Sequence, residues 1–239
     1  MEIMELEINR VCNRSCINCN RLCNMKDVGI RFDVGYDMTV GQVKKFVLEM
    51  RNHGRHLDRV TIIGGEPLLH PNIDQIVSVI ERGLLNTGLV DHCQLITNKT
   101  LPVSKGIKRS KVEVKTLAEP KDKREHHFCF FVAPIDKGWK YKRCECIQTC
   151  GFLLCSRGYF PCVLAPSISY VFNIKNLARF SLPQSTDDFG NFDEIVCKYC
   201  PWGSGFDKLL WEKNEGRPTT RSWLNAMLRK KDINDFRKY

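Results

Sequence analysis

The apolar stretch IMELEI at residues 3–8 leads directly into the loop CNRSCINC at residues 12–19. The first stretch predicts a strand that is buried on nearly both faces. The second stretch spaces Cys12, Cys16 and Cys19 as C-x3-C-x2-C. Clustered thiolates can hold a soft metal centre. A 4Fe–4S cubane usually takes four cysteines, so three would leave one iron open for a small molecule.

The bulk composition sets the class of protein. The chain has 239 residues, of which 43% are hydrophobic, enough for one large domain or for a medium domain with an appendage. The sequence contains no run of about 18 apolar residues, so no membrane span is expected. The acidic N-terminus begins a strand at once and does not resemble a signal peptide, so we expect a cytoplasmic protein without a membrane partner.

Thirteen cysteines are many for a protein in a reducing compartment, where such density favours metal ligation over disulfides. Two, Cys93 and Cys129, stand apart in apolar runs and are expected to be core thiols. The others fall in two groups, one of Cys12, Cys16, Cys19 and Cys23 and one of Cys144, Cys146, Cys150, Cys155, Cys162, Cys197 and Cys200.

The formal net charge of +10 is concentrated in one segment. Residues 99–143 hold 13 Lys/Arg and 5 Asp/Glu, a local net charge of +8. A basic patch attracts nucleic acid or another polyanion. The other interpretation is a solvated loop face.

Strand and helix patterns alternate through the first hundred residues. Strands are expected at residues 3–10, 60–63 and 93–98, and helices at roughly 40–53 and 72–84. This order predicts parallel βα units with right-handed crossovers. Ligands of such sheets bind at the carboxyl ends of the strands, where the cysteine loop also lies.

The rest of the first half is less regular. Short strands are expected at residues 112–114 and 128–132, and proline, glycine and lysine leave no convincing helix over 99–127. We therefore expect an α/β fold in which residues 1–135 form a partial (β/α) barrel of parallel strands, open on one side.

A small cysteine-rich domain of a β-hairpin and helices is expected over residues 136–239. FLLC at 152–155 and YFPCV at 159–163 flank a glycine turn and predict the hairpin. Cys197 and Cys200 then form a C-x2-C pair, which suits one metal or one cluster. One or two terminal helices are expected over about 206–239.

The first half resembles the radical S-adenosylmethionine enzymes. The resemblance rests on the C-x3-C-x2-C loop and on Gly64-Gly65-Glu66-Pro67, which follows the second strand directly. It covers roughly residues 1–135. In this family the loop thiols ligate a 4Fe–4S cluster at the catalytic centre. The resemblance therefore implies that Cys12, Cys16 and Cys19 are its ligands.

The same resemblance implies how S-adenosylmethionine is held. Gly64, Gly65 and Glu66, with Pro67 completing the turn, would bind its methionyl ammonium. Asn98, at the end of the third strand, would help to hold the nucleoside. A glycine pair permits close approach of backbone carbonyls, which an ammonium needs.

Two features depart from the family pattern. Asn18 stands before the last cysteine of the loop, where the family commonly has an aromatic residue. Cys23 is an extra thiol outside the pattern, and we interpret it as a bystander.

The second group of thiols resembles the auxiliary-cluster domains called SPASM or twitch, which implies a second 4Fe–4S cluster. Four positions match the twitch pattern best, namely Cys150, Cys162, Cys197 and Cys200. Cys144 and Cys146 are the alternatives, and Cys155 is interpreted as a packing residue. A zinc site with four cysteine ligands remains the other interpretation of this group.

The resemblance implies reductive cleavage of S-adenosylmethionine to a 5′-deoxyadenosyl radical, with flavodoxin or ferredoxin as electron donor. The radical abstracts hydrogen from a substrate carbon, in an oxidation or a rearrangement. The basic segment favours an anionic substrate, such as a nucleotide, a nucleic acid base or a sugar. Two alternatives stay open: a peptide maturase, although no leader-peptide recognition domain is recognisable, and a zinc-containing nucleic-acid-binding protein.

Overall fold

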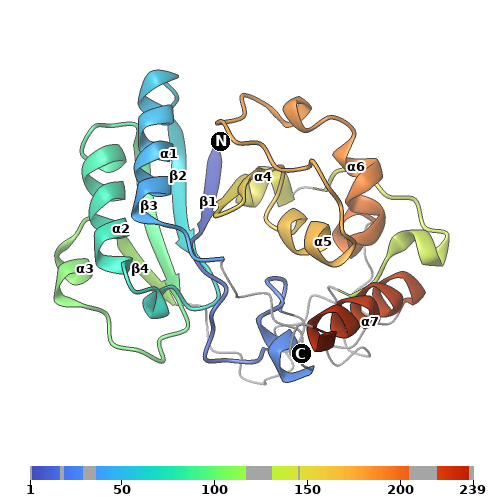
Figure 1. The fold of residues 1–239 in the computed structure, drawn as a ribbon. Helices are drawn as coiled ribbons and strands as arrows, with labels where there is room; N and C mark the ends of the chain where they lie inside the picture. Colours follow the sequence, from blue (N-terminus) through green and yellow to red (C-terminus); the bar gives the residue numbers. More distant parts are fainter. Residues whose placement is uncertain are drawn as a thin grey trace.

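A six-stranded sheet forms the centre of the computed structural model, which describes residues 2–16, 19–28, 36–116, 131–144, 146–204 and 220–236 (Figure 1). The strand order is β4-β3-β2-β1-β5-β6, and every neighbouring pair is parallel except the β5–β6 hairpin. The strands are β1 Ile3–Glu7, β2 Leu57–Ile63, β3 Val90–Thr97, β4 Glu113–Thr116, β5 Phe152–Cys155 and β6 Gly158–Phe160. The described sheet does not close, which confirms the expected partial barrel.

The helices fall on two sides of β1. In Figure 1, α1 and α2 cover the sheet on one side, and α4, α5, α6 and α7 gather on the other. The α-helices are α1 Val40–Asn52, α2 Ile73–Ile80, α3 Lys105–Arg109, α4 Cys146–Cys150, α5 Ala165–Val171, α6 Phe192–Ile195 and α7 Arg221–Phe236. Shorter turns are 3-10 helices at Cys23–Val28, Pro67–Leu69, Pro134–Lys137, Thr186–Phe189, Cys197–Tyr199 and Pro201–Ser204, and a π-helical turn at Glu81–Leu85.

Side-chain alternation along β1 separates two faces of the sheet. Met4, Leu6 and Ile8 are fully buried in the main apolar cluster. Glu5 and Glu7 occupy the alternate positions and therefore point to the opposite face. The first strand thus builds the core with one face and carries the buried Glu7 and the half-buried Glu5 on the other.

The expected helices form where their apolar spacing predicts them. Helix α1 begins with a capping box between Thr39 and Gln42 and buries Val43, Phe46, Val47 and Met50. Helix α2 also buries its apolar side and continues as the π-helical turn to Leu85. The right-handed βα order then brings the ends of β1, β2 and β3 to one edge of the sheet.

The expectation of no helix over residues 99–127 was wrong for the short helix α3. The Ser104 hydroxyl accepts a hydrogen bond from the Ile107 backbone N–H at 3.1 Å and starts this helix. Ile107 is buried and holds the helix against the body. A local cap and one apolar anchor outweigh the unfavourable composition there. Residues 117–127 lie outside the described part.

The strand expected at residues 128–132 is not present at Phe131 and Val132, which have no strand structure. Residues 128–130 lie outside the described part. Phe131 is fully buried, and its ring packs edge-on against Trp223 with the ring centroids 5.5 Å apart. Its apolar character therefore reflects packing against α7 rather than sheet pairing.

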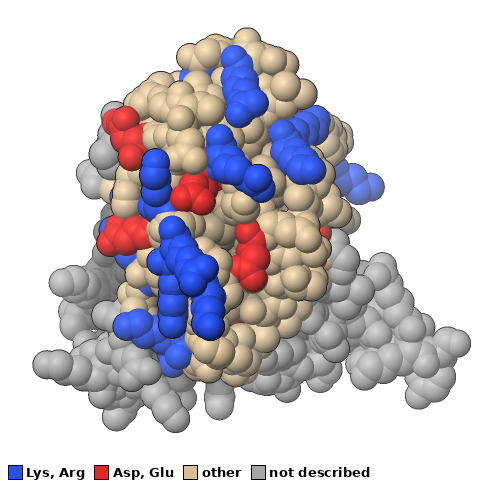
Figure 2. Space-filling view, turned by 90° about the vertical axis from the view of Figure 1, so that its left-hand side faces the viewer, with Lys and Arg blue, Asp and Glu red and all other residues tan. Residues whose placement is uncertain are grey.

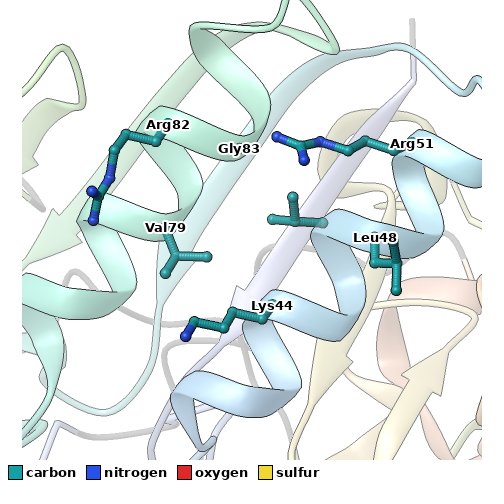
Figure 3. A pocket seen from close by; sticks show the side chains of 7 residues that line it. Lys44, Leu48, Arg51, Val79, Arg82 and Gly83 are labelled. Carbon is teal, nitrogen blue, oxygen red and sulfur yellow. The ribbon is translucent and has the colours of Figure 1, made fainter.

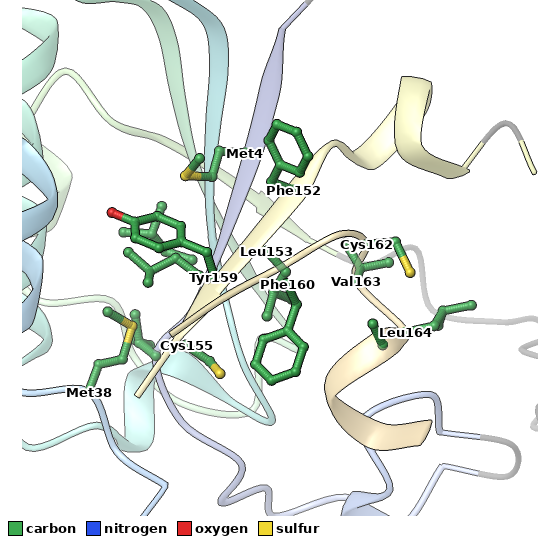
Figure 4. Close-up of a cluster of buried hydrophobic side chains, with 14 of the residues drawn as sticks. Met4, Met38, Phe152, Leu153, Cys155, Tyr159, Phe160, Cys162, Val163 and Leu164 are labelled. Atoms are coloured by element: carbon green, nitrogen blue, oxygen red, sulfur yellow. The ribbon is translucent and has the colours of Figure 1, made fainter. Parts of the chain in front are cut away.

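The expected hairpin is present and extends the central sheet. Strand β5 pairs in parallel with β1, so that Met4 lies opposite Phe152 and Glu7 opposite Cys155. Figure 4 shows the hairpin side chains packed with Met4 in one apolar cluster. The division into units at residues 135 and 136 stays a prediction.

Among the described residues, none of the helices combines the length and the apolar character required to cross a membrane.

Gly151 and Gly138 form a matched pair for testing the β1–β5 pairing, because both have left-handed backbones with φ of +74° and +68°. A Cβ on Gly151 would lie 1.7 Å from the Ile3 carbonyl oxygen, whereas one on Gly138 would meet nothing within 4 Å. We expect Gly138→Ala to cost roughly 1–2 kcal/mol. Gly151→Ala must also push β5 from β1 and should cost more than about 4 kcal/mol. Urea unfolding measures the loss of unfolding free energy in both variants, and equal losses would contradict the β1–β5 pairing.

Candidate active site

The three predicted cluster cysteines follow β1 in a loop whose residues 17 and 18 lie outside the described part. Cys12 and Cys19 are half-buried and Cys16 is exposed. Backbone hydrogen bonds from Cys19 N to Cys16 O (3.3 Å) and from Leu22 N to Cys19 O (2.9 Å) coil the loop back on itself. The loop therefore presents its thiols at the carboxyl end of β1.

The thiols of this loop lie close enough to influence one another. Burial raises the pKa of Cys16, and the thiolates of Cys19 and Cys12 raise it further. A hydrogen bond with Cys23 lowers the pKa of Cys19 to about 6. Hydrogen bonds with Cys12 and Cys19 raise the pKa of Cys23 well above its usual value. Cys23 is therefore an immediate neighbour of the predicted ligands.

The donor set suits an iron–sulfur cluster, because soft thiolates are the ligands that such clusters take. Within the described residues, no three His, Cys, Asp or Glu side chains converge as a closed metal site. The cysteine loop instead provides neighbouring thiols of which Cys16 remains exposed.

The turn at residues 64–67 is joined to the segment that precedes the cysteines. Gly65 N donates to Asn9 O at 3.0 Å and Glu66 N donates to Val11 O at 2.8 Å. A Cβ on Gly64 would lie 2.1 Å from Asn9 Oδ1, and one on Gly65 would lie 2.4 Å from Val11 O. Only glycine permits this approach, so the pair places the turn against the cysteine loop.

Glu66 is fully buried and links three elements through its carboxylate. Its Oε1 accepts from Leu68 N (2.9 Å) and from the Thr97 hydroxyl (2.8 Å), and its Oε2 accepts from Asn98 N (2.7 Å). The carboxylate thus caps the turn at Pro67–Leu69 and holds the end of β3 beside the end of β2. The Glu66 carboxylate thus accepts three hydrogen bonds from within the chain, and these bonds give it a structural role.

Asn98 lies between the end of β3 and the cysteine loop. Its Nδ2 is 3.9 Å from Cys12 Sγ and donates to Asn13 Oδ1 at 3.0 Å. Its Oδ1 accepts from the Thr100 backbone and hydroxyl. The structure therefore brings Asn98 to the loop thiols, as its position at the end of the third strand predicted.

A buried charge network lies on the opposite face of β1 from the apolar core. Glu7 pairs with Arg10 and with Arg21, and Arg21 also pairs with Glu5 at 2.8 Å. The guanidinium of Arg10 lies 4.2 Å from the ring centroid of Tyr36. Its Nη1 and Nη2 are buried and have no hydrogen-bond partner in the part of the chain that the structure describes. The inner face of the sheet therefore carries two buried donors beside the cysteine loop.

The second group of thiols is gathered between the β5–β6 hairpin and the C-x2-C turn. Cys162, Cys197 and Cys200 are buried. Burial raises the pKa of Cys162 to about 12, and the nearby Cys144 and Cys150 add to the rise. Burial, then Cys162 and Cys144, raise the pKa values of Cys197 and Cys200. Cys144 therefore acts on the pKa of all three buried thiols, and Cys150 acts on that of Cys162.

Two other cysteines of the second half have separate surroundings. Cys155 accepts a hydrogen bond from the Tyr36 hydroxyl at 3.2 Å and is buried in the hairpin, in agreement with its interpretation as a packing residue. The side chain of Cys146 lies outside the described part.

Basic side chains spread over the outer face of α1, α2 and α3 (Figure 2). A groove of about 350 Å³ between α1 and α2 is lined by Lys44, Arg51 and Arg82 around the apolar side chains of Leu48 and Val79 (Figure 3). It contains none of the predicted site residues. The described part of the basic 99–143 segment adds exposed lysines at α3 to the same side of the molecule.

Sequence reasoning did not single out Asn9, although it is central to the site. Asn9 Nδ2 donates to Glu66 O at 2.9 Å, while its Oδ1 is buried without a partner beside Gly64. The sequence signal that could have singled out Asn9 was its position as a polar residue directly after an apolar strand. Thr97 was likewise named only as a strand residue, and its bond to Glu66 depends on the tertiary fold.

Glu66→Gln tests the structural role of the carboxylate. The amide would turn one acceptor into a donor that faces another N–H or O–H, so the variant should lose about 2–3 kcal/mol of unfolding free energy. Glu113→Gln is the control, because that side chain is 49% exposed and should change stability by less than about 0.5 kcal/mol. Urea unfolding of both variants measures the two losses of unfolding free energy. Equal stabilities would contradict the structural role of Glu66 in joining the turn to β3.

Comparisons with known proteins add an independent observation. Residues 6–120, just under half of the chain, match the family model described as the radical SAM superfamily. No curated protein matches the chain.

Two solved structures have weak overall similarity. SuiB of Streptococcus suis, bound to S-adenosylmethionine, is 19% identical with a TM-score of 0.36, over 48% of this chain and 24% of its own. BtrN, in complex with AdoMet and 2-DOIA, is 14% identical with a TM-score of 0.42, over 92% of this chain and 100% of its own. This chain therefore spans about a quarter of SuiB.

The matched segment contains the three loop thiols, the turn at residues 64–67 and Asn98. The part of the chain that matches the radical SAM family model is thus the part that carries the predicted first site.

Proposed function

We propose that the chain is an enzyme that cleaves S-adenosylmethionine reductively and uses the resulting 5′-deoxyadenosyl radical on a substrate carbon. The observation that carries the proposal is the junction between the cysteine loop and the glycine turn, within the segment that matches the family. Cys12, Cys16 and Cys19 would hold a 4Fe–4S cluster. Bound there, it would pass one electron from a donor such as flavodoxin or ferredoxin to the sulfonium of S-adenosylmethionine.

The chain's own residues would bind and orient the methionyl group. The backbone carbonyls of Gly64 and Gly65 belong to a turn that lies directly against residues 9–11. Asn9 Oδ1 is a buried acceptor without a partner at the same place, and an ammonium is a donor that it lacks. Glu66 adds a negative charge beside this acceptor, and Pro67 fixes the turn that follows.

Asn98 would define the nucleoside side of the site. Its amide links Asn13 to the end of β3 and stands within 3.9 Å of the Cys12 sulfur. An amide there offers both donor and acceptor atoms near the thiols. Its position supports a role in orienting the nucleoside relative to the loop.

The substrate is proposed to be an anionic small molecule, such as a nucleotide, a nucleic acid base or a sugar, which undergoes oxidation or rearrangement. The net charge of +10 supports this class. The two buried, unpartnered nitrogens of Arg10 also support it, because they need an acceptor. A nucleic acid could instead contact the basic outer face through residues of the 99–143 segment.

A second 4Fe–4S cluster is proposed in the C-terminal half. Cys162, Cys197 and Cys200 are common to the sequence-based assignment and to the buried group. The sequence pattern favoured Cys150 as the fourth ligand, whereas Cys144 raises the pKa of all three buried thiols. We therefore propose Cys144 for that place. Such a cluster could accept an electron from a substrate radical or shape the substrate pocket.

Cys16→Ala tests the first cluster. Loss of one of three thiolates should reduce 5′-deoxyadenosine formation to background in the anaerobic, reduced protein, as mass spectrometry can measure. Cys93→Ala is the control, since Cys93 is a fully buried thiol of the core and its loss should leave the reaction intact. Undiminished cleavage by Cys16→Ala would refute the ligand assignment.

Cys144→Ala and Cys150→Ala distinguish the two candidates for the second site. Wild-type protein should contain about eight iron atoms per chain, from two cubanes. We expect Cys144→Ala to lose up to about half of this iron and Cys150→Ala to keep it. The reverse result would restore the sequence-based assignment, and zinc in place of iron would contradict the second cluster.

A further inference from the structure

A separate pocket lies where the β5–β6 turn, α5 and α7 meet. Its volume is about 280 Å³, roughly that of nine water molecules in the liquid. Figure 1 places α5 beside α7 in this part of the molecule, and the two helices are in contact. The pocket, named here the Tyr170 pocket, is lined by Arg157, Phe160, Pro166, Ser169, Tyr170, Asn173, Ile174, Asn176, Leu177, Ala178 and Lys230.

Two cations are held over one aromatic ring in this pocket. The Lys230 ammonium lies 4.3 Å and the Arg157 guanidinium 5.1 Å from the ring centroid of Tyr170. Arg157 also lies 5.3 Å from the ring of Tyr36, which in turn stacks on Arg10. Aromatic contacts keep both long side chains at the pocket rather than in bulk water. Among the described lining residues, the two charged side chains are both cations.

Neutral polar groups complete the lining. The Ser169 hydroxyl is buried and has no hydrogen-bond partner among the described residues. A buried hydroxyl without a partner costs roughly 1–3 kcal/mol, so its presence in a pocket wall points to an atom that arrives from outside. Asn173 and Asn176, both in the left-handed backbone region, add two side-chain amides at the rim.

We propose that the Tyr170 pocket binds a phosphoryl group. Two cations, a hydroxyl and two amides provide several convergent donors, which a multiply charged tetrahedral anion uses better than a carboxylate does. At about 280 Å³ the pocket accommodates a phosphate or a diphosphate. In this proposal the phosphoryl group is the charged end of a larger molecule.

The pocket is also tied to the proposed catalytic end of the sheet. In α5 the Ser167 hydroxyl donates to the Asn20 carbonyl oxygen at 2.7 Å, directly after the cysteine loop. This bond joins α5, whose Ser169 lines the pocket, to the segment that follows the cysteine loop. The inference about the Tyr170 pocket rests on the proposed function. It narrows the proposed substrate class to phosphorylated small molecules.

Inorganic pyrophosphate is the probe for the pocket. Isothermal titration of the anaerobically purified full chain should detect its binding, and Arg157→Gln and Lys230→Gln should each weaken it about tenfold or more. Lys175→Gln is the charge-matched control, because Lys175 is exposed on the adjacent loop but does not line the pocket. It should change the affinity less than about twofold.

Ser169→Ala separates ligand binding from a structural role. The variant should bind pyrophosphate several-fold more weakly while its unfolding free energy stays equal or rises, since a buried unpartnered hydroxyl is removed. No binding by the wild-type chain, or equal losses in Lys175→Gln and the two pocket variants, would overturn the proposal.

Formation of 5′-deoxyadenosine, assayed in parallel, separates this proposal from the proposed function. Pyrophosphate binding that depends on Arg157, without any cleavage of S-adenosylmethionine, would support the pocket and refute the radical enzyme. Cleavage without pyrophosphate binding would refute the pocket alone.

Discussion

Two backbone hydrogen bonds, from Gly65 N to Asn9 O and from Glu66 N to Val11 O, hold the site together. They join the turn after β2 to the segment between β1 and the cysteine loop. The contact is so close that a Cβ on either Gly64 or Gly65 would overlap the backbone or side chain of residues 9–11. Because the turn cannot move independently of the loop, the thiols and the carbonyls of the turn share one rigid junction. The buried Glu66 carboxylate extends this junction to the end of β3.

The opposite face of β1 shows how the same strand serves packing and chemistry. Its apolar positions build the core, while Glu5 and Glu7 carry buried ion pairs with Arg10 and Arg21. Desolvating these charges is expensive, so each needs its partner, and loss of one would leave the others uncompensated. Arg10 keeps two nitrogens without acceptors. The network therefore makes the interior beside the cysteine loop polar. It is not expected to add stability.

The C-terminal half is anchored to the first half through β5. Gly151 lets the backbone of β5 approach β1 closely. The hairpin leads to Cys162, which raises the pKa values of Cys197 and Cys200 in the C-x2-C turn. Aromatic packing reinforces this region, with Phe172 stacked on Tyr199 at 3.8 Å between ring centroids and set edge-on to Trp223. The second thiol group is therefore positioned by the same sheet that positions the first. Both proposed clusters depend on β1.

The sequence by itself determined the elements whose signals are local: the apolar strands, the capped helix α1, the glycine turn, the hairpin and the spacing of the loop thiols. It predicted the partial barrel because strand and helix patterns alternate regularly. Only the tertiary structure decided that Asn9 and Thr97 support Glu66, that β5 joins β1, and that Cys144 acts on the pKa of all three buried thiols. These contacts join residues more than thirty positions apart, or depend on the direction of a side chain in a short irregular turn. The periodicity of a sequence describes which residues share a face of one element, and it carries no information about which distant backbone a glycine or a thiol will meet.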